Sequence, residues 1–303
     1  MGSDQRIVRC ARVSFAKDAE VDKERDKKLI KYLFENKHAS PFEHVIIAFE
    51  GEKSLWLELI EKVSSPVFQL YWAEGYIYLN LRNFINAFEH IPQEVKEEVK
   101  KRLPTTYAII EGDNTESYSL DSSYVIKKIE TSSGWIGLVD RLELGTSMDY
   151  YTFVVECPLF VARQWHRHRF GSYNEVSRRY VSFEPTFYIP KYLRKQSLKN
   201  RQASIEEQIE EPWNSLFLKK IKFYMDDLLT LYKNMLEKAV ARELARGVLP
   251  QFMHTRFYWT VPRISLDNFI SLRRHESAQK EIREFAQALV ELVGYRKSYN
   301  LRL

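Results

Sequence analysis

The stretch from Cys157 to Tyr180 constrains this chain most, because it gathers positive charge among aromatic and small polar residues. It reads CPLFVARQWHRHRFGSYNEVSRRY, with Glu175 as its only acid and no lysine. A helix that merely faces solvent would interleave lysine with glutamate. Arginine alone favours a bidentate grip on phosphate or stacking on an aromatic ring. The stretch therefore predicts a site for an anionic ligand, with these arginines as candidates: Arg163, Arg167, Arg169, Arg178 and Arg179.

Length and composition set broad limits. With 303 residues, 45% of them apolar, the chain can bury a full core as one large domain or two small ones. No apolar run approaches the roughly 20 residues of a membrane span, and the first residues lack the apolar core of a signal peptide. We therefore expect a cytoplasmic protein without a membrane partner. The net charge of +5 is a mild bias toward anionic partners.

The spacing of apolar residues predicts a mixed α/β or α+β fold without a nucleotide-binding doubly wound sheet. Strands are expected at 5–15, 44–49, 149–157 and 257–261, with an aromatic extended run at 68–79. Helices are expected at 21–36, 55–62, 80–90, 93–103, 159–169 and 205–246, and as two segments within 265–294. The polar stretch from Thr105 to Ser123 is the best candidate for a mobile loop or a subdomain boundary.

Several common catalytic patterns are missing. His166 and His168 flank Arg167; on a helix they would point to nearly opposite faces, and on a strand the arginines would repel a cation, so no metal site is expected. No glycine-rich phosphate loop and no nucleophile elbow occur. Cys10 and Cys157 have no partner motif, which argues against a disulfide framework or a zinc site.

The arginine stretch resembles a known family. Arg167-His168-Arg169, followed by seven residues and Ser177, is similar to the signature of the flavin-dependent thymidylate synthases, as are its surroundings QW-x-RHR-xx-SYNE-x-S-x-RY. Other blocks occur in the family's order and bring the resemblance to roughly two thirds of the chain. They are ARVSF at 11–15, H-x-SPFEH at 38–44, RELAR-x-VLP at 242–250, TRF-x-WTV at 255–261, and NF-x-x-LR-x-x-x-x-AQ-x-EIR at 268–283.

The resemblance implies an activity. Members make dTMP from dUMP, with methylenetetrahydrofolate as carbon donor, NADPH as reductant and FAD as mediator. Reduced flavin passes hydride to the pyrimidine and no protein cysteine attacks the ring, which agrees with the missing cysteine motif. The family's fold is a central sheet with flanking helices. Its sites are built from several subunits, so a homotetramer with shared active sites is implied, and no nucleic acid is expected as a partner.

The resemblance also implies roles for individual residues. Arg273 is expected to stabilise the enolate-like charge that develops on the pyrimidine. FAD is expected to contact Ser40, Glu43, Arg167, His168, Arg169, Glu175 and Asn268, with His38 near the flavin and the folate. The substrate dUMP is expected to contact Gln164, Arg167, Glu175, Ser177, Arg178, Arg179, Arg246 and Arg273, with Arg246 coming from a neighbouring subunit.

Three features depart from the family pattern. His166 stands where an apolar residue is usual, and Pro262-Arg263-Ile264 replaces Asn-x-Arg, where Arg263 could substitute in a shifted register. The third is an inserted segment, residues 51–148, which we expect to belong to one domain spanning 1–303. Within it, Asn80-x-Arg82-x-x-x-Asn86 repeats the missing spacing. This spacing has two interpretations. It arises by chance or from a helix cap, or it marks the segment as a decayed internal copy or as one that reaches the flavin site.

Other interpretations stay open for the whole chain. A nucleic-acid-binding protein could use the arginines on phosphate and the aromatic rings on bases, although its basic residues should spread over a larger stripe. A catalytically impaired relative is also compatible with the departures. Taken alone, Arg246 and Arg273 would be surface helix arginines, Glu43 a paired or exposed acid, and His38 a partner of a helix end.

Overall fold

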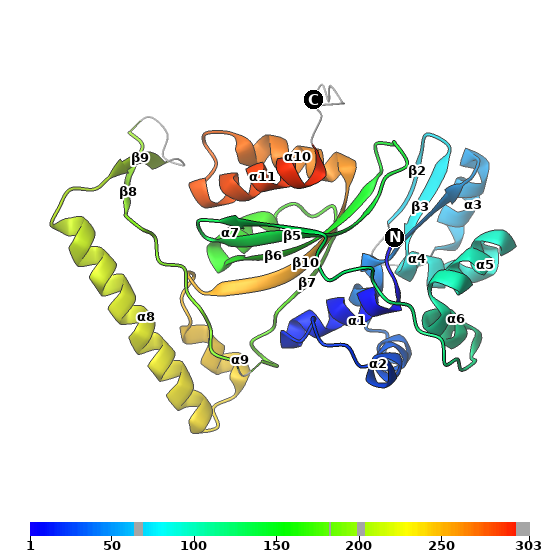
Figure 1. Cartoon of the computed structure of the whole chain (residues 1–303), viewed down its shortest axis with the longest axis horizontal. Coiled ribbons are helices and arrows are strands. Elements are labelled where there is room, and N and C mark those ends of the chain that lie inside the picture. The colour runs from blue at the N-terminus through cyan, green and yellow to red at the C-terminus, as the bar shows by residue number, and fades with distance from the viewer. Residues whose placement is uncertain (64–68, 182, 199–203, 295–303) are drawn as a thin grey trace.

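The computed structural model describes residues 1–63, 69–181, 183–198 and 204–294, and the expected mixed α+β fold is confirmed (Figure 1). A five-stranded antiparallel sheet has the order β4-β5-β6-β10-β7, beside a three-stranded sheet β1-β3-β2 and a two-stranded sheet β8-β9. The strands are β1 (Ile46–Glu50), β2 (Leu70–Ala73), β3 (Tyr76–Asn80), β4 (Lys127–Thr131), β5 (Gly134–Leu142), β6 (Tyr150–Pro158), β7 (Ser172–Glu175), β8 (Arg194–Gln196), β9 (Ser204–Gln208) and β10 (His254–Pro262).

Helices surround these sheets. They are α1 (Asp4–Arg12), α2 (Lys23–Glu35), α3 (Lys53–Lys62), α4 (Leu81–Asn86), α5 (Gln93–Arg102), α6 (Pro104–Glu111), α7 (Leu159–Trp165), α8 (Trp213–Glu237), α9 (Arg242–Ala245), α10 (Arg263–Arg274) and α11 (Lys280–Val293). Short 3-10 turns are η1 (Val13–Phe15), η2 (Ser40–His44), η3 (Phe88–His90) and η4 (Arg246–Val248). No helix among the described residues is long and apolar enough to cross a bilayer.

The main sheet is covered on both faces. Helices α7, α10 and α11 pack on one face, where Trp165 and Phe269 form the centre of an aromatic cluster with ring centroids 4.6 Å apart. On the other face Cys10 of α1 and Val13 of η1 pack against Tyr258 of β10. Alternation along β10 explains both layers, because successive side chains of a strand point to opposite faces. Figure 1 shows α10 and α11 above the sheet and α1 below it.

The inserted segment contributes strands to the three-stranded sheet and to the five-stranded main sheet. Its strands β2 and β3 pair beside β1, with Ile47 opposite Leu79 and Leu70 opposite the same residue. Its strands β4 and β5 continue the main sheet outward from β6, with Trp135 opposite Glu156. The segment therefore shares backbone hydrogen bonds with elements on both sides of it in the sequence.

The expected strand at 5–15 is wrong, because these residues form α1 and η1. Ser3 caps the helix by accepting a hydrogen bond from the backbone nitrogen of Arg6. Arg6 and Arg9 of α1 are both buried. Their guanidinium groups bind Asp121 at 3.0 and 2.8 Å. A buried ion pair with a partner more than a hundred residues away hides the helical period.

The polar stretch at 105–123 is not a free loop in its first part. Residues 104–111 form α6, and the chain that follows is tied to α1 through the buried carboxylate of Asp4. Asp4 accepts hydrogen bonds from Thr106 Oγ1 at 2.6 Å, from Thr105 N at 3.2 Å and from Ser119 N at 3.1 Å. Asp4 therefore anchors Thr105, Thr106 and Ser119, while residues 111–114, 116, 117 and 120 are exposed to water.

The other expected helices and strands agree with the structure to different degrees. The helix expected at 159–169 ends at Trp165, and the one expected at 205–246 begins only at Trp213, since 204–208 form β9. The aromatic run at 68–79 and the helix at 80–90 are confirmed in substance for the described residues, as β2, β3, α4 and η3. The helix at 21–36, the strands at 44–49, 149–157 and 257–261, and the two helices within 265–294 are confirmed with shifts of a few residues.

Candidate functional site

Arg273, His168 and Gln164 meet where α7 and α10 end. Arg273 donates from Nε to His168 Nε2 at 3.0 Å and from Nη2 to the backbone oxygen of Gln164 at 3.1 Å. The Gln164 side chain donates to Gln279 Oε1 at 2.6 Å. The Arg273 side chain is half-buried, and its Nη1 has no protein partner among the described residues. Two fixed contacts thus orient a guanidinium that still has donors to offer.

His168 is held in its neutral form. Its imidazole packs on the Phe269 ring at 4.6 Å between centroids, and it is 9% exposed. Burial, and then the neighbouring charge of Arg273, lower the pKa of His168 to about 4. Burial also lowers the pKa of Arg273 below its ordinary value. A neutral imidazole can accept from Arg273, so the pair is stable at neutral pH.

Strand β7 lies at the centre of the candidate site, because its alternating side chains reach two sets of site residues. On one side, Ser172 donates to Glu43 Oε2 at 3.0 Å and Asn174 Oδ1 lies 3.1 Å from His44 Nε2. The side chain between them, Tyr173, points the other way and donates to the backbone oxygen of His168 at 2.7 Å. One short strand therefore connects η2 with the His168–Arg273 pair.

A third set of predicted residues follows β7. The Glu175 carboxylate accepts from Thr255 Oγ1 at 2.6 Å, and Ser177 N donates to the backbone oxygen of Ser14 at 3.0 Å. Arg178 is buried, donates to the backbone oxygen of Phe183 at 2.7 Å, and has its pKa lowered by burial. Its Nε is buried without a partner among the described residues.

Arg179 and Arg246 lie apart from Arg273. Arg179 is exposed and stands 3.9 Å from Glu243 of α9, while the exposed Arg246 begins η4 directly after α9. Figure 1 shows α9 below the main sheet and α10 above it. Within a single chain, the structure therefore does not bring all predicted dUMP contacts together.

Most of the predicted flavin contacts other than Glu43 are exposed. Ser40, His38 and Asn268 are exposed, and so are Arg167 and Arg169, which make no ion pair among the described residues. Glu43 is buried at 7% exposure and binds Arg82 of α4, whose Nη1 lies 2.7 Å from Glu43 Oε1. The free cations suit a phosphate, whereas the carboxylate of Glu43 is already paired inside the protein.

The departures from the family pattern have local explanations. His166 packs edge-on against Tyr173 and Phe257, with centroids 4.9 Å apart in both cases, so it forms part of the wall. Arg263 donates to Asp267 at 2.9 Å and to the Tyr151 hydroxyl at 3.1 Å. The helix-cap interpretation of Asn80 is confirmed, since Asn80 Oδ1 accepts from Asn83 N at 2.8 Å.

Sequence reasoning missed two residues of this network. Ser172 and Gln69 link Glu43 to Asn80. Gln69 has no local pattern that marks it, and Ser172 lies in the SYNE block but is given no role by the sequence. The Asn80-x-Arg82-x-x-x-Asn86 spacing suggested that Arg82 contacts the flavin. In the structure Arg82 binds Glu43 instead. Among the described residues, no three His, Cys, Asp or Glu side chains cluster as metal ligands.

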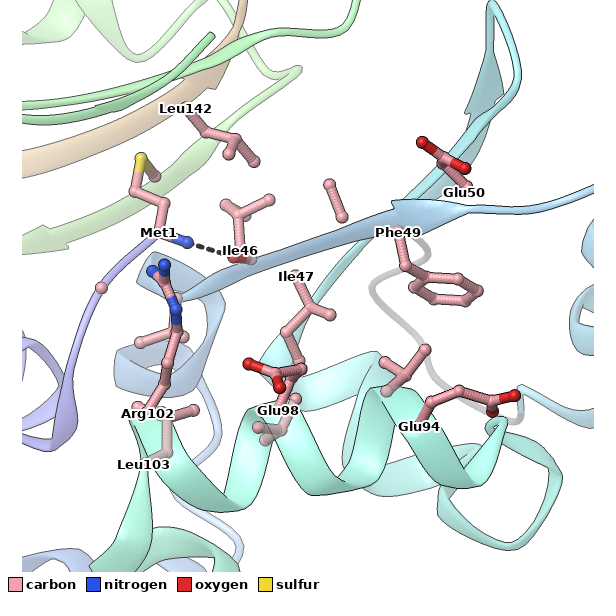
Figure 2. A pocket seen from close by; sticks show the side chains of 15 residues that line it. Met1, Ile46, Ile47, Phe49, Glu50, Glu94, Glu98, Arg102, Leu103 and Leu142 are labelled. Carbon is pink, nitrogen blue, oxygen red and sulfur yellow. Dashed lines mark hydrogen bonds between the residues drawn. The ribbon is translucent and has the colours of Figure 1, made fainter. Parts of the chain in front are cut away.

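Two cavities have lining residues that differ from those of these contacts. One of about 470 Å³ opens between β1 and α5, with mainly apolar walls and with Glu94, Glu98 and Arg102 of α5 beside it (Figure 2). It contains none of the predicted site residues. A second, of about 380 Å³, is lined by Arg274, Lys280 and Arg283 together with Glu206, which pairs with Lys280 at 2.9 Å. The candidate site is therefore defined here by its residues and their contacts.

Comparison with known proteins assigns the chain to a family. The family described as "Thymidylate synthase complementing protein" matches residues 1–58 and 146–295, and the gap between them falls inside the inserted segment. A solved structure, the UMP/dUMP methylase PolB from Streptomyces cacaoi bound with 5-Br dUMP, aligns with 96% of this chain and 87% of that chain at 20% identity, with a TM-score of 0.42.

Named relatives agree with the family match. The flavin-dependent thymidylate synthase of Aquifex aeolicus is 64% identical over 305 residues, which cover 98% of this chain and 96% of that protein. Those of Thermosipho africanus and Thermus thermophilus are 45% and 43% identical over 45% and 49% of this chain, and over 59% and 54% of their own lengths. By the family match and the near full-length relative, this chain belongs to the flavin-dependent thymidylate synthase family.

Proposed function

We propose that this protein converts dUMP to dTMP, with methylenetetrahydrofolate as carbon donor, NADPH as reductant and FAD as the bound flavin. Family membership supports the activity. The observation that carries it to particular residues is the fixed guanidinium of Arg273 between His168 and Gln164. Both cysteines are buried, and burial raises the pKa of the Cys10 and Cys157 thiols well above the ordinary value. A thiolate nucleophile is therefore disfavoured, in keeping with a flavin route.

Arg273 has the properties that polarising a uracil ring requires. Charge develops on the ring oxygen and the adjacent nitrogen as C5 becomes nucleophilic, and preoriented donors stabilise that charge. Arg273 is already oriented by two hydrogen bonds, so it need not reorganise when substrate binds. Gln164 of α7 lies next to it and is a suitable second contact for the pyrimidine.

The donor set fits a flavin nucleotide. Arg167 and Arg169 would bind its phosphates, and His168, Ser40, Glu43, Glu175 and Asn268 are proposed as further contacts, with His38 toward the folate. Bound FAD supplies the hydride-transfer chemistry that protein side chains lack. The protein's own contribution is to bind and orient the nucleotides and to keep the Arg273 guanidinium fixed beside the pyrimidine.

We propose that the site is completed by other copies of the chain in a homotetramer. Ser177, Arg178, Arg179 and Arg246 are assigned to dUMP. Arg246 directly follows α9, which lies on the other side of the main sheet from α10, the helix of Arg273, and this separation supports the arrangement. Helix α8 also exposes large apolar side chains, an unusual surface for a monomer. They are Trp213, Leu216, Phe217, Phe223, Tyr224 and Leu231.

We propose further that residues 1–303 form one domain. The strand pairing of the inserted segment with β1 and β6 supports a single folding unit. The complete assay contains purified protein, dUMP, methylenetetrahydrofolate, FAD and NADPH, and it measures dTMP. Yellow protein and dTMP formation are expected, and parallel reactions with NADH test the reductant. Protein that takes up no FAD, or that binds FAD and makes no dTMP, would overturn the proposal.

A further inference from the structure

Glu43 is held from two sides by residues from different parts of the chain. Arg82 of the inserted segment donates to Oε1 at 2.7 Å, and Ser172 of β7 donates to Oε2 at 3.0 Å. The Glu43 side chain is 9% exposed and the Arg82 side chain 20% exposed, so water competes little for either. Charge-assisted hydrogen bonds of this kind are the stronger class in proteins.

The inserted segment closes a ring of contacts around this pair. Ser172 Oγ accepts from Gln69 Nε2 at 3.0 Å, and Gln69 Oε1 accepts from Asn80 Nδ2 at 3.1 Å. Asn80 also caps the helix that carries Arg82. The orientation of Arg82 is therefore fixed by the same contacts that fix Ser172, and both converge on Glu43.

The ring leads to the proposed catalytic pair through β7. Ser172 contacts Glu43, and the next residue, Tyr173, donates to the backbone oxygen of His168 at 2.7 Å. His168 in turn accepts from Arg273 at 3.0 Å. A displacement of Glu43 would thus be passed to a strand that positions His168.

We propose that Arg82 is a positioning residue for the flavin site: it holds Glu43, and through Ser172 and β7 it keeps Glu43 and His168 in their binding geometry. The proposal rests on the proposed function, which places Glu43 and His168 against FAD. It gives the inserted segment a role in the site without a direct contact to the nucleotide. Removing Arg82 leaves a buried carboxylate without its charge partner, which forces Glu43 to move or to take up a proton.

The test is a titration of flavin-free protein with FAD, read by flavin fluorescence and by the visible circular dichroism of the bound flavin. Arg82→Met is expected to raise the Kd for FAD about tenfold or more, the size expected from one lost charge-assisted hydrogen bond. Arg82→Lys should recover part of the affinity. Arg102→Met is the matched control. Arg102 lies on α5 beside the apolar cavity and, in the described part of the chain, contacts none of the predicted site residues, so the Kd of this variant for FAD should equal that of the wild type.

A double-variant cycle separates positioning from general damage. In a Glu43→Gln background, Arg82→Met should change the Kd for FAD much less than in the wild type, because the pair is already broken. Equal effects in both backgrounds, or a wild-type Kd and dichroism spectrum for Arg82→Met, would overturn the proposal while leaving the proposed function standing. A wild-type protein that binds no FAD would overturn both.

Discussion

Arg273 Nε lies 3.0 Å from His168 Nε2, and because the guanidinium can only donate, this histidine nitrogen must accept. An imidazolium has no lone pair to offer, so the contact and the positive charge on His168 exclude one another. The pair explains why a motif rich in arginine contains a buried histidine: the histidine is an acceptor that orients Arg273.

Arg273→Ala is expected to retain FAD and to lose about 10²-fold to 10³-fold in turnover, the usual cost of removing one oriented donor to developing charge. Its control is Arg274→Ala, which removes the neighbouring exposed arginine and should keep turnover within about twofold of the wild type. Steady-state dTMP formation and flavin absorbance measure both variants. Full turnover in Arg273→Ala would remove Arg273 from its proposed role.

Stability is expected to fall as pH drops from 6.5 toward 4. Burial lowers the pKa of His168 to about 4 and that of His44, which binds Asn174, to about 3, whereas both residues titrate near 6.5 when unfolded. In this window the unfolded chain binds protons that the native chain excludes, so the free energy of unfolding decreases with falling pH by about 2 kcal/mol per histidine at pH 5.

Urea unfolding at pH 7 and pH 5 measures that loss of stability. His44→Gln has no titrating ring and should lose less stability than the wild type between the two values. An equal loss in both proteins would contradict the assignment of the pH dependence to His44.

Asp4→Asn is expected to destabilise the fold by about 1–3 kcal/mol. The two carboxylate oxygens of Asp4 accept from Thr106 and Ser119, whereas an amide has only one oxygen and leaves one of these donors without an acceptor. Glu116→Gln is the control on the same stretch, since the Glu116 side chain is 96% exposed. Chemical denaturation provides both values. If Asp4→Asn unfolds at the wild-type midpoint, the carboxylate does not anchor residues 104–119.

Gly134→Ala is expected to cost about 1–3 kcal/mol through overpacking. Gly134 joins β4 to β5 with φ at +150°, and an added Cβ would lie 2.0 Å from the backbone oxygen of Glu156. Gly247→Ala meets open space at an ordinary φ and serves as the comparison. Thermal unfolding of the two variants tests whether this turn packs against β6, and equal midpoints would argue that it does not.

Mixing two inactive variants tests the shared site. If Arg246 and Arg273 act at one site from different chains, random assembly of Arg246→Ala with Arg273→Ala leaves about a quarter of the sites with neither substitution. Activity should therefore reappear after the two proteins are unfolded and refolded together, but not when each is refolded alone. No recovery in the mixture, with both variants folded, would place the two arginines on the same chain's site.

The sequence correctly predicted helices and strands that have a local apolar pattern. It predicted the wrong secondary structure for α1, where charged residues pair with a distant partner. The helix at 23–35 and strand β10 follow apolar periodicity, and they were found. Helix α1 was mistaken for a strand because Arg6 and Arg9 are buried against Asp121, a partner that no local window contains. Residues 205–208 belong to the expected helix at 205–246, whereas in the structure they pair with the nearby β8 as part of β9.

The site residues also fall into those that the sequence identified and those whose contacts only the structure shows. The motif residues were found through the resemblance, and the structure brings Gln164, His168 and Arg273 together. Ser172 and Tyr173 belong to the SYNE block of the motif, but their contacts follow from the alternation of a four-residue strand that is too short to be predicted from apolar periodicity. Arg82 was noticed for its spacing, but the carboxylate that it binds becomes apparent only when residues 43 and 82 are seen side by side.

The edge of the main sheet has a consequence for solubility. Strand β6 is buried along nearly its whole length, and β5 covers the backbone groups that it would otherwise present. The outermost strand is instead β4, whose KKIET sequence places charges at the rim. Exposed, apolar edge strands pair readily with other molecules, whereas short charged ones discourage it. The inserted segment thus supplies the strands that cover β6, and we expect a chain shortened by this segment to expose the β6 edge to pairing with other molecules.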